Sequence, residues 1–66
     1  MVNRAYYNGL ILGTLLKIMR KYPDMRFGQI LSNLELTEDL FYEEPDKTLE
    51  RIHNSELYKK ASAINI

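Results

Sequence analysis

The sequence predicts an all-α fold: a small domain of three helices followed by a short fourth helical turn. In three separate segments, apolar residues recur at the three- and four-residue spacing of an amphipathic helix. A Pro-Asp pair, which suits the first turn of a helix, stands at positions 23–24 and again at 45–46. The chain of 66 residues has room for a single domain, which we expect to span residues 1–66.

The small size of the chain predicts self-association. One hydrophobic core of this size rarely contributes more than about 3–5 kcal/mol, and small domains usually add disulfides, a metal or a partner subunit. The chain has no cysteine and one histidine, His53, so disulfides and a conventional structural metal site are not expected. We therefore expect tight helix packing together with homo-oligomerisation.

Residues 4–21 form the first predicted helix. Asn3 can cap it by accepting a hydrogen bond from a free backbone N–H, and Pro23 ends it. With 100° of rotation per residue, six apolar side chains lie on one side of this helix and are expected to face the core: Ile11, Leu12, Leu15, Ile18, Met19 and Tyr22. Leu16 lies at the edge of this arc.

A second face of this helix is the predicted oligomer interface. Ala5, Gly9 and Gly13 recur every four residues, and glycine inside a helix costs about 1 kcal/mol relative to alanine. Close packing of another backbone against this strip would offset the cost; the alternative is that the glycines are simply tolerated. Tyr6 and Leu10 lie outside the core arc and add an apolar patch that suggests a partner or a second subunit.

The second predicted helix begins at Pro23-Asp24 and spans residues 25–34. Its predicted buried face has the i, i+3, i+4, i+7 spacing of an amphipathic helix and consists of Phe27, Ile30, Leu31 and Leu34. Gly28 is expected where this helix crosses the first one.

The acidic segment 35–44 is expected to form a connection with a short helical turn. Thr37 can cap this turn, and Leu40 and Phe41 are expected to reach the core, because large apolar residues in a charged stretch usually fold inward. A brief strand is the alternative, although the sequence offers it no partner strand.

Pro45-Asp46 starts the third predicted helix, in which Leu49 and Ile52 face inward. Asn54-Ser55 interrupts this helix, and Ser55 can cap a last turn that carries residues 57–60. Residues 61–66 show no strong pattern and are expected to fray.

The charges are separated along the chain although the formal net charge is zero. Residues 1–34 carry +4, residues 35–50 carry −6 and residues 51–66 carry +2. A nucleic-acid partner is not expected, because it requires a dominant basic field. We expect the acidic middle and the basic first helix to attract each other.

The sequence has neither the pattern of a signal peptide nor an apolar run long enough to span a membrane. A cytoplasmic protein is therefore expected.

No catalytic, metal or cofactor motif stands out. The acidic residues lack the alternating spacing and central glycine of a calcium loop. His53 has no second histidine or cysteine and is expected on a helix surface, and the serines lie in no nucleophile motif. Neither an enzyme nor a cofactor is therefore expected.

A helix-turn-helix that binds nucleic acid is one alternative, since three short helices match its outline. However, its connection would be about ten residues long and acidic, whereas the motif has a tight turn. Its reading helix would offer only Lys47 and Arg51, with Asp46 and Glu50 repelling phosphate.

A small anion pocket is a second hypothesis. Five residues near the end of the first helix and the start of the second could form it: Arg20, Lys21, Tyr22, Arg26 and Gln29. The favoured alternative is that Arg26 pairs with the acidic segment and that Gln29 bonds backbone in the long connection between the second and third helices.

Part of the chain resembles a group of short uncharacterised phage and prophage proteins. The resemblance rests on an Arg-Phe-Gly-Gln-Ile stretch at 26–30 and on Asp39-Leu40-Phe41-Tyr42 followed by acidic residues, and it covers residues 22–52. It implies a viral or mobile-element origin but no particular activity. The positions that it highlights are Arg26, Gly28, Gln29, Asn33, Asp39, Phe41 and Tyr42.

Together these features predict a non-enzymatic helical interaction protein that acts as a homo-oligomer. If it is phage-encoded, its expected role is to modulate the host by occupying a host protein or a small anionic ligand. The alternatives are a helix-turn-helix-like nucleic-acid-binding domain and a structural assembly factor.

Overall fold

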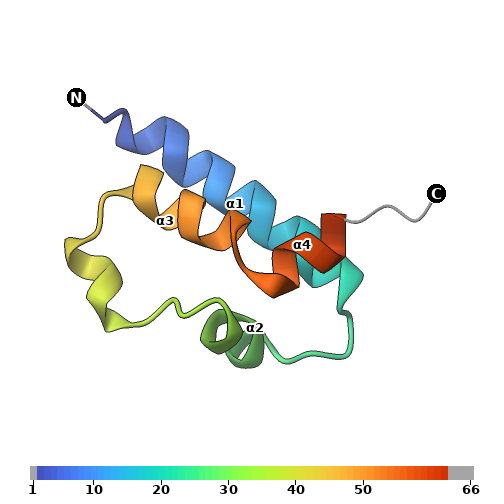
Figure 1. Ribbon diagram of the computed structural model, residues 1–66. Coiled ribbons are helices and arrows are strands. Elements are labelled where there is room, and N and C mark those ends of the chain that lie inside the picture. The colour runs from blue at the N-terminus through green and yellow to red at the C-terminus, as the bar shows by residue number, and fades with distance from the viewer. Residues whose placement is uncertain (1, 63–66) are drawn as a thin grey trace.

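Four α-helices and one 3₁₀ helix make up the fold in the computed structural model, which describes residues 2–62 (Figure 1). They are α1 (Arg4–Lys21), α2 (Phe27–Asn33), η1 (Glu38–Tyr42), α3 (Pro45–His53) and α4 (Glu56–Ser62). The described residues contain no strand, so the all-α prediction is confirmed and the brief strand considered for the acidic segment is wrong.

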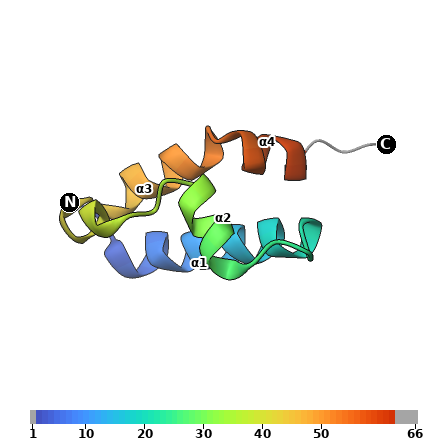
Figure 2. The same ribbon diagram turned by 90° about the horizontal axis from the view of Figure 1, so that it is seen from below.

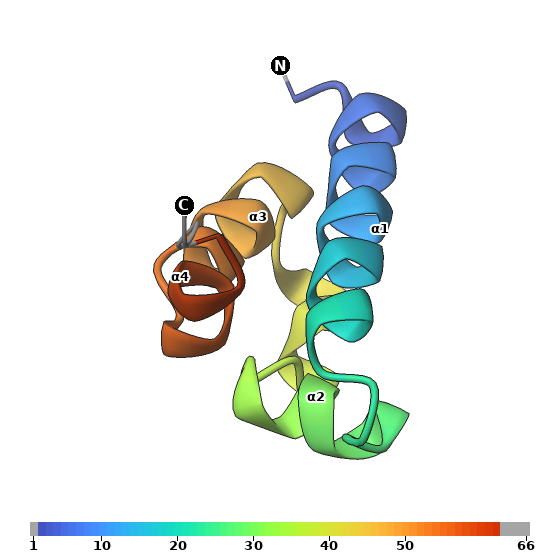
Figure 3. The same cartoon turned by 90° about the vertical axis from the view of Figure 1, so that its right-hand side faces the viewer.

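The longest helix, α1, packs against α3 and α4, which follow one another along its length (Figure 1). The helix α2 lies outside these two layers, below both of them in Figures 1 and 3, and in the view from below it crosses in front of the gap between them (Figure 2). The connection from α2 through η1 returns to the end of the molecule where α1 begins (Figures 1 and 2).

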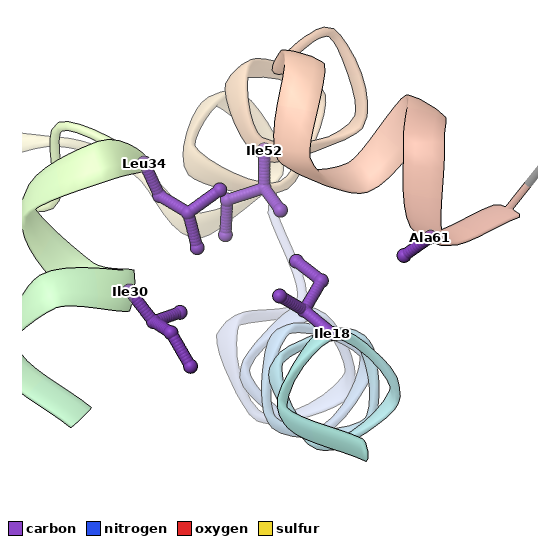
Figure 4. Packing of buried hydrophobic residues seen from close by; sticks show 5 residues of the cluster. All are labelled: Ile18, Ile30, Leu34, Ile52 and Ala61. Atoms are coloured by element: carbon purple, nitrogen blue, oxygen red, sulfur yellow. The ribbon is translucent and has the colours of Figure 1, made fainter. Parts of the chain in front are cut away.

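A small core joins the four helices (Figure 4). Ile18 of α1, Ile30 of α2 and Ile52 of α3 are almost completely buried, together with Leu34 and Ala61. Ile18, Ile30, Leu34 and Ile52 were predicted to face inward, and their burial confirms this. Besides Pro45, only six apolar residues are buried among those described, which fits a domain close to the lower size limit for independent stability.

The helix α1 follows its predicted bounds. The Asn3 side chain accepts a hydrogen bond from the Tyr6 N–H at 3.0 Å and caps the N-terminus, as expected. Five of the six residues predicted to face the core do so: Ile18 is buried, and Ile11, Leu15, Met19 and Tyr22 pack against the core. Leu12, the sixth, is 68% exposed, so the covered arc of α1 is narrower than predicted on that side.

The helix α2 starts two residues later than predicted. The Arg26 N–H donates to the Gln29 side-chain oxygen at 2.7 Å, which fixes Arg26 as the residue before the helix. Phe27 is therefore the first residue of the helix, three positions before the buried Ile30. It is 62% exposed, so its predicted place on the buried face is wrong. A methyl group placed on Gly28 would meet no atom within 4 Å, so the predicted helix crossing at Gly28 is wrong.

A Schellman motif ends α2. The Leu36 N–H donates to the Leu31 carbonyl at 2.9 Å, and the Glu35 N–H donates to the Ser32 carbonyl at 3.0 Å. Glu35 has a φ of 58°, the left-handed conformation that this motif requires and that glycine usually supplies.

The short helix η1 carries its two aromatic side chains outward. Thr37 caps it by accepting a hydrogen bond from the Asp39 N–H, as predicted. Leu40 is half-buried, but Phe41 is 83% exposed, so its expected role in the core is wrong. In a 3₁₀ turn the next residues lie about 120° and 240° further round, which turns Phe41 and Tyr42 away from the face of Leu40.

The helices α3 and α4 are separated as predicted. Ser55 accepts a hydrogen bond from the Tyr58 N–H at 3.2 Å and so caps α4. The helix α4 extends further than expected, because Ala61 reaches the core and Ser62 is its last residue. The predicted fraying is therefore wrong for these two residues, and the rest of that prediction, residues 63–66, lies outside the described residues.

Candidate interaction surface

The side of α1 that faces away from α3 and α4 carries four of the seven large hydrophobic side chains that are exposed among the described residues, and we name it the outer face of α1. It consists of Ala5, Tyr6, Gly9, Leu10, Leu12, Gly13 and Leu16, all of which are exposed. Figure 3 shows α3 and α4 on one side of α1 and no described element on the opposite side. All five residues of the predicted oligomer interface belong to this face.

The glycines lie in the middle of the outer face. A methyl group placed on Gly9 or Gly13 would meet no atom within 4 Å, so no backbone of the same subunit packs closely against them. Leucines flank the glycines on one side, where Leu12 and Leu16 are 68% and 48% exposed, and Tyr6 and Leu10 flank them on the other. A contiguous apolar surface of this kind typically marks an interaction site.

A hollow lies at the C-terminal end of the outer face, and we name it the basic hollow. Its volume is about 420 Å³, and its lining combines two residues of the outer face with three cations: Gly13, Leu16, Lys17, Arg20 and Lys21. Lys17 extends its ammonium group to 5.4 Å from the centre of the Tyr58 ring. The lining of the hollow therefore combines apolar surface at Gly13 and Leu16 with positive charge at Lys17, Arg20 and Lys21.

The five residues proposed for an anion pocket lie in three separate environments. Arg20 and Lys21 line the basic hollow. The half-buried Tyr22 donates its hydroxyl to the Leu57 carbonyl at 3.4 Å. Arg26 and Gln29 are joined in the cap of α2. Gln29 thus bonds backbone, but at Arg26 and not in the long connection. The ion pairs of residues 2–62 do not include Arg26, so its expected pairing with the acidic segment is wrong. Two of the five candidates remain together at the hollow.

The second exposed apolar feature is the aromatic pair of η1. Phe41 and Tyr42 are 83% and 88% exposed, and their rings meet edge-on with centroids 4.9 Å apart. The exposed acidic side chains of Glu38 and Asp39 lie on the same turn. Two adjacent exposed aromatic rings are unusual on the surface of a monomer and are typical of contact residues.

Arg51 is the centre of a polar network that sequence reasoning missed. Its guanidinium donates twice to Glu43, at 2.6 and 3.3 Å, and also donates to the Glu35 carbonyl at 2.8 Å. The buried Thr48 hydroxyl donates to the same carboxylate at 2.7 Å. Hydrogen bonds from Arg51 and then from Thr48 hold the pKa of Glu43 below its usual value.

This network has a functional consequence, because Arg51 was one of two cations expected to contact phosphates in the helix-turn-helix alternative. Its guanidinium is committed to Glu43 and to backbone carbonyls at the end of α2. No short-range pattern in the sequence could have revealed the pair, since its two members are eight residues apart and Glu43 lies between η1 and the helix that carries Arg51.

A second ion pair joins the start of α1 to the start of α3. Arg4 donates to both carboxylate oxygens of Glu44, at 2.9 and 2.8 Å, and the pKa of Glu44 is lowered as a result. The pair realises the expected attraction between the basic first helix and the acidic segment. Neither of the two ion pairs found in residues 2–62 includes Glu38 or Asp39.

The lone histidine lies on the surface of α3. The exposed His53 ring packs against Tyr58, with ring centroids 4.5 Å apart, as its predicted surface position allows. Among residues 2–62, no group of three or more His, Cys, Asp or Glu side chains could hold a metal ion. In the same part of the chain, every helix is too short or too polar to cross a bilayer.

Comparisons with protein-family models, curated proteins and solved structures gave no match.

Proposed function

We propose that this protein is a non-enzymatic interaction protein that assembles with copies of itself through the outer face of α1. The observation that supports this proposal best is the exposure of Tyr6, Leu12 and Leu16 along one continuous helix face. Burying apolar surface is favourable by about 25 cal/mol per Å². A chain with so small a core would gain much of its stability from covering this face.

The proposed biological role combines this assembly with the phage resemblance. We place the protein in the cytoplasm of a host cell, where it occupies a host protein or a small anionic ligand. The positive rim of the basic hollow supports an acidic partner, because Lys17, Arg20 and Lys21 lie together there. A structural assembly factor would use the same self-association without a host target.

Binding of nucleic acid is disfavoured by the network around Arg51. Once this side chain is paired, α3 offers phosphate only Lys47, beside the acidic Asp46 and Glu50. Titration of a labelled DNA duplex at low salt tests this alternative. Salt-sensitive binding that is lost on Lys47→Ala would revive it.

Sedimentation velocity over about 10 to 500 µM tests the assembly, a range that covers weak and moderate contacts. We expect the weight-average mass of the wild-type protein to rise with concentration. The double variant Gly9→Gln/Gly13→Gln should remain monomeric, because two long polar side chains would cover the outer face. Gly28→Gln is the matched control, since Gly28 is also an exposed helical glycine with free space around it.

Two results would contradict the proposal. One is a wild-type protein that stays monomeric over the whole concentration range. The other is assembly that the two α1 substitutions leave unchanged. Circular dichroism of the variants guards against misfolding, and glutamine should preserve α1 because it is a better helix former than glycine.

A further inference from the structure

The aromatic turn η1 and the basic hollow are two exposed surfaces of opposite charge at opposite ends of the molecule. The turn lies at the end where α1 begins, whereas the hollow is built on the last two turns of α1 at the other end (Figures 1 and 2). The molecule measures 37 Å along its longest axis. The two surfaces of one copy therefore cannot meet each other.

We propose that η1 of one copy docks on the basic hollow of a second copy, so that the copies assemble head to tail. This inference rests on the proposed function and names what covers the C-terminal part of the outer face of α1. A symmetric pairing of two outer faces would instead place the same surface on both sides of the contact and leave Phe41 and Tyr42 uncovered.

The apolar parts of the two surfaces match. Phe41 and Tyr42 protrude as a pre-ordered pair, held by the Thr37 cap and by the half-buried Leu40. The hollow offers about 420 Å³ with Leu16 on its floor and no side chain at Gly13, which leaves room for an aromatic ring. Large aromatic rings that pack into a hollow on a partner are typical of the residues that dominate protein interfaces.

The charges match as well. Glu43 and Glu44 are already paired with Arg51 and Arg4, whereas Glu38 and Asp39 are exposed and belong to none of the ion pairs found in residues 2–62. The cations of the hollow, Lys17, Arg20 and Lys21, belong to none of these pairs either. Docking would bring these two sets together, and an arginine or lysine beside an aromatic ring adds a cation–π contact.

A contact between two different surfaces leaves one surface of each kind free at the ends of every assembly. The copies can therefore form open chains or closed rings whose size grows with concentration. Because one short turn enters one hollow, the contact is at the small end of specific interfaces, and a micromolar Kd is expected.

Mixing two complementary variants tests this arrangement. Phe41→Ala/Tyr42→Ala removes the aromatic pair but keeps the hollow. Arg20→Glu/Lys21→Glu reverses the rim but keeps the aromatic turn. Each variant alone should show self-association weakened at least about 30-fold, the effect of losing an interface hot spot. An equimolar mixture should form a complex of two chains and no larger species, because one functional surface of each kind remains in the mixture.

Two matched variants control for the loss of exposed aromatic and basic residues in general. Phe27→Ala removes an exposed aromatic ring on α2, and Lys59→Glu/Lys60→Glu reverses two exposed cations on α4. Both should assemble as the wild-type protein does. At concentrations low enough for the wild type to be dissociated, thermal unfolding of all variants should be close to that of the wild type, because the altered side chains are exposed.

The outcomes separate this inference from the proposed function. If the aromatic variant assembles normally while Gly9→Gln/Gly13→Gln does not, head-to-tail docking is wrong and the outer face still mediates assembly. If the two complementary variants fail to pair when mixed, docking of η1 on the hollow is wrong. If the wild-type protein is monomeric throughout, both the inference and the proposed function fail.

Discussion

Arg51, in the last turn of α3, forms a two-point ion pair with Glu43, which lies just before the start of that helix. The contact distances are 2.6 and 3.3 Å, and the same guanidinium reaches the carbonyls of Leu34 and Glu35. The two side chains are 34% and 26% exposed, so solvent screens this pair less than an ordinary surface pair. In a domain with so few buried apolar residues, such a connection carries a considerable share of the stability.

The first prediction concerns Arg51→Lys. An ammonium group keeps the charge but cannot donate in the planar arrangement that holds Glu43 and two carbonyls at once. We expect the free energy of unfolding to fall by about 1–2 kcal/mol, the usual effect of losing hydrogen bonds to a charged group at a partly exposed site. Urea unfolding followed by circular dichroism measures this change.

Arg4→Lys is the matched control for this prediction. The pair of Arg4 and Glu44 has the same two-point geometry, but its side chains are 71% and 45% exposed. Exposed pairs add little to stability, so this variant should lose clearly less than Arg51→Lys. Equal losses would show that burial does not distinguish the two pairs.

The second prediction is the pH dependence of stability. The pKa of Glu43 is lowered in the folded state, first by Arg51 and then by Thr48, and the pKa of Glu44 is lowered by Arg4. A carboxyl group with a lowered folded pKa stabilises the fold above its unfolded pKa. This contribution is lost as the pH falls from about 4.5, the usual value of a glutamate, through the lower pKa of the folded state.

The variant Glu43→Gln tests this linkage. It should be less stable than the wild type at pH 7, and the difference between the two proteins should shrink as the pH falls below about 4.5. Urea unfolding at a series of pH values gives both curves. A difference that stays constant down to pH values well below that point would mean that Glu43 is not stabilised as a carboxylate.

The periodicity of apolar residues predicted where the helices lie, but it assigned too many side chains to the core. The bounds of α1, the caps at Asn3, Thr37 and Ser55, and the inward positions of Ile18 and Ile52 follow from local rules, and the structure agrees with them. How wide an arc of α1 is covered depends on how many helices pack against it. That number is a tertiary property, so spacing alone assigned Leu12 and Phe27 to the core although both are exposed.

The same limit applies to the candidate surface. Ala5, Gly9 and Gly13 were predicted on an interface strip because small residues recur every four positions, and they do lie on one exposed face. The aromatic pair and the Arg51 network could not be predicted in this way. The exposure of the pair follows from the geometry of a short 3₁₀ turn, and the network joins segments that become neighbours only on folding.

The third prediction concerns Glu35, which occupies the left-handed position of the Schellman motif with a φ of 58°. A residue with a side chain costs about 1 kcal/mol or more in this conformation, and glycine adopts it freely. Glu35→Gly should raise the free energy of unfolding by up to about 1 kcal/mol, less the extra entropy that glycine has in the unfolded chain. The backbone carbonyl that accepts from Arg51 is kept.

Glu35→Val is the opposite test at the same position. A β-branched side chain fits the left-handed region poorly, so this variant should unfold at a lower urea concentration than the wild type. If glycine and valine shift the midpoint in the same direction, the effect comes from the lost carboxylate and not from the backbone.

The fourth prediction concerns the glycines of α1. Neither Gly9 nor Gly13 has a left-handed backbone, and a methyl group on either would meet no atom of the same subunit within 4 Å. In a dilute monomer, each Gly→Ala change should therefore raise the free energy of unfolding by about 1 kcal/mol through helix propensity alone. Urea unfolding at low micromolar protein concentration measures this gain.

The same two variants behave differently when the protein assembles. Partner surface that packs against the glycine strip would have to move away from the added methyl groups, so the stabilisation should shrink as the protein concentration rises. Gly28→Ala provides the comparison, because Gly28 has equally free surroundings but lies on α2. Its effect should not depend on concentration. A gain for Gly9→Ala and Gly13→Ala that is equally independent of concentration would mean that nothing packs against the strip.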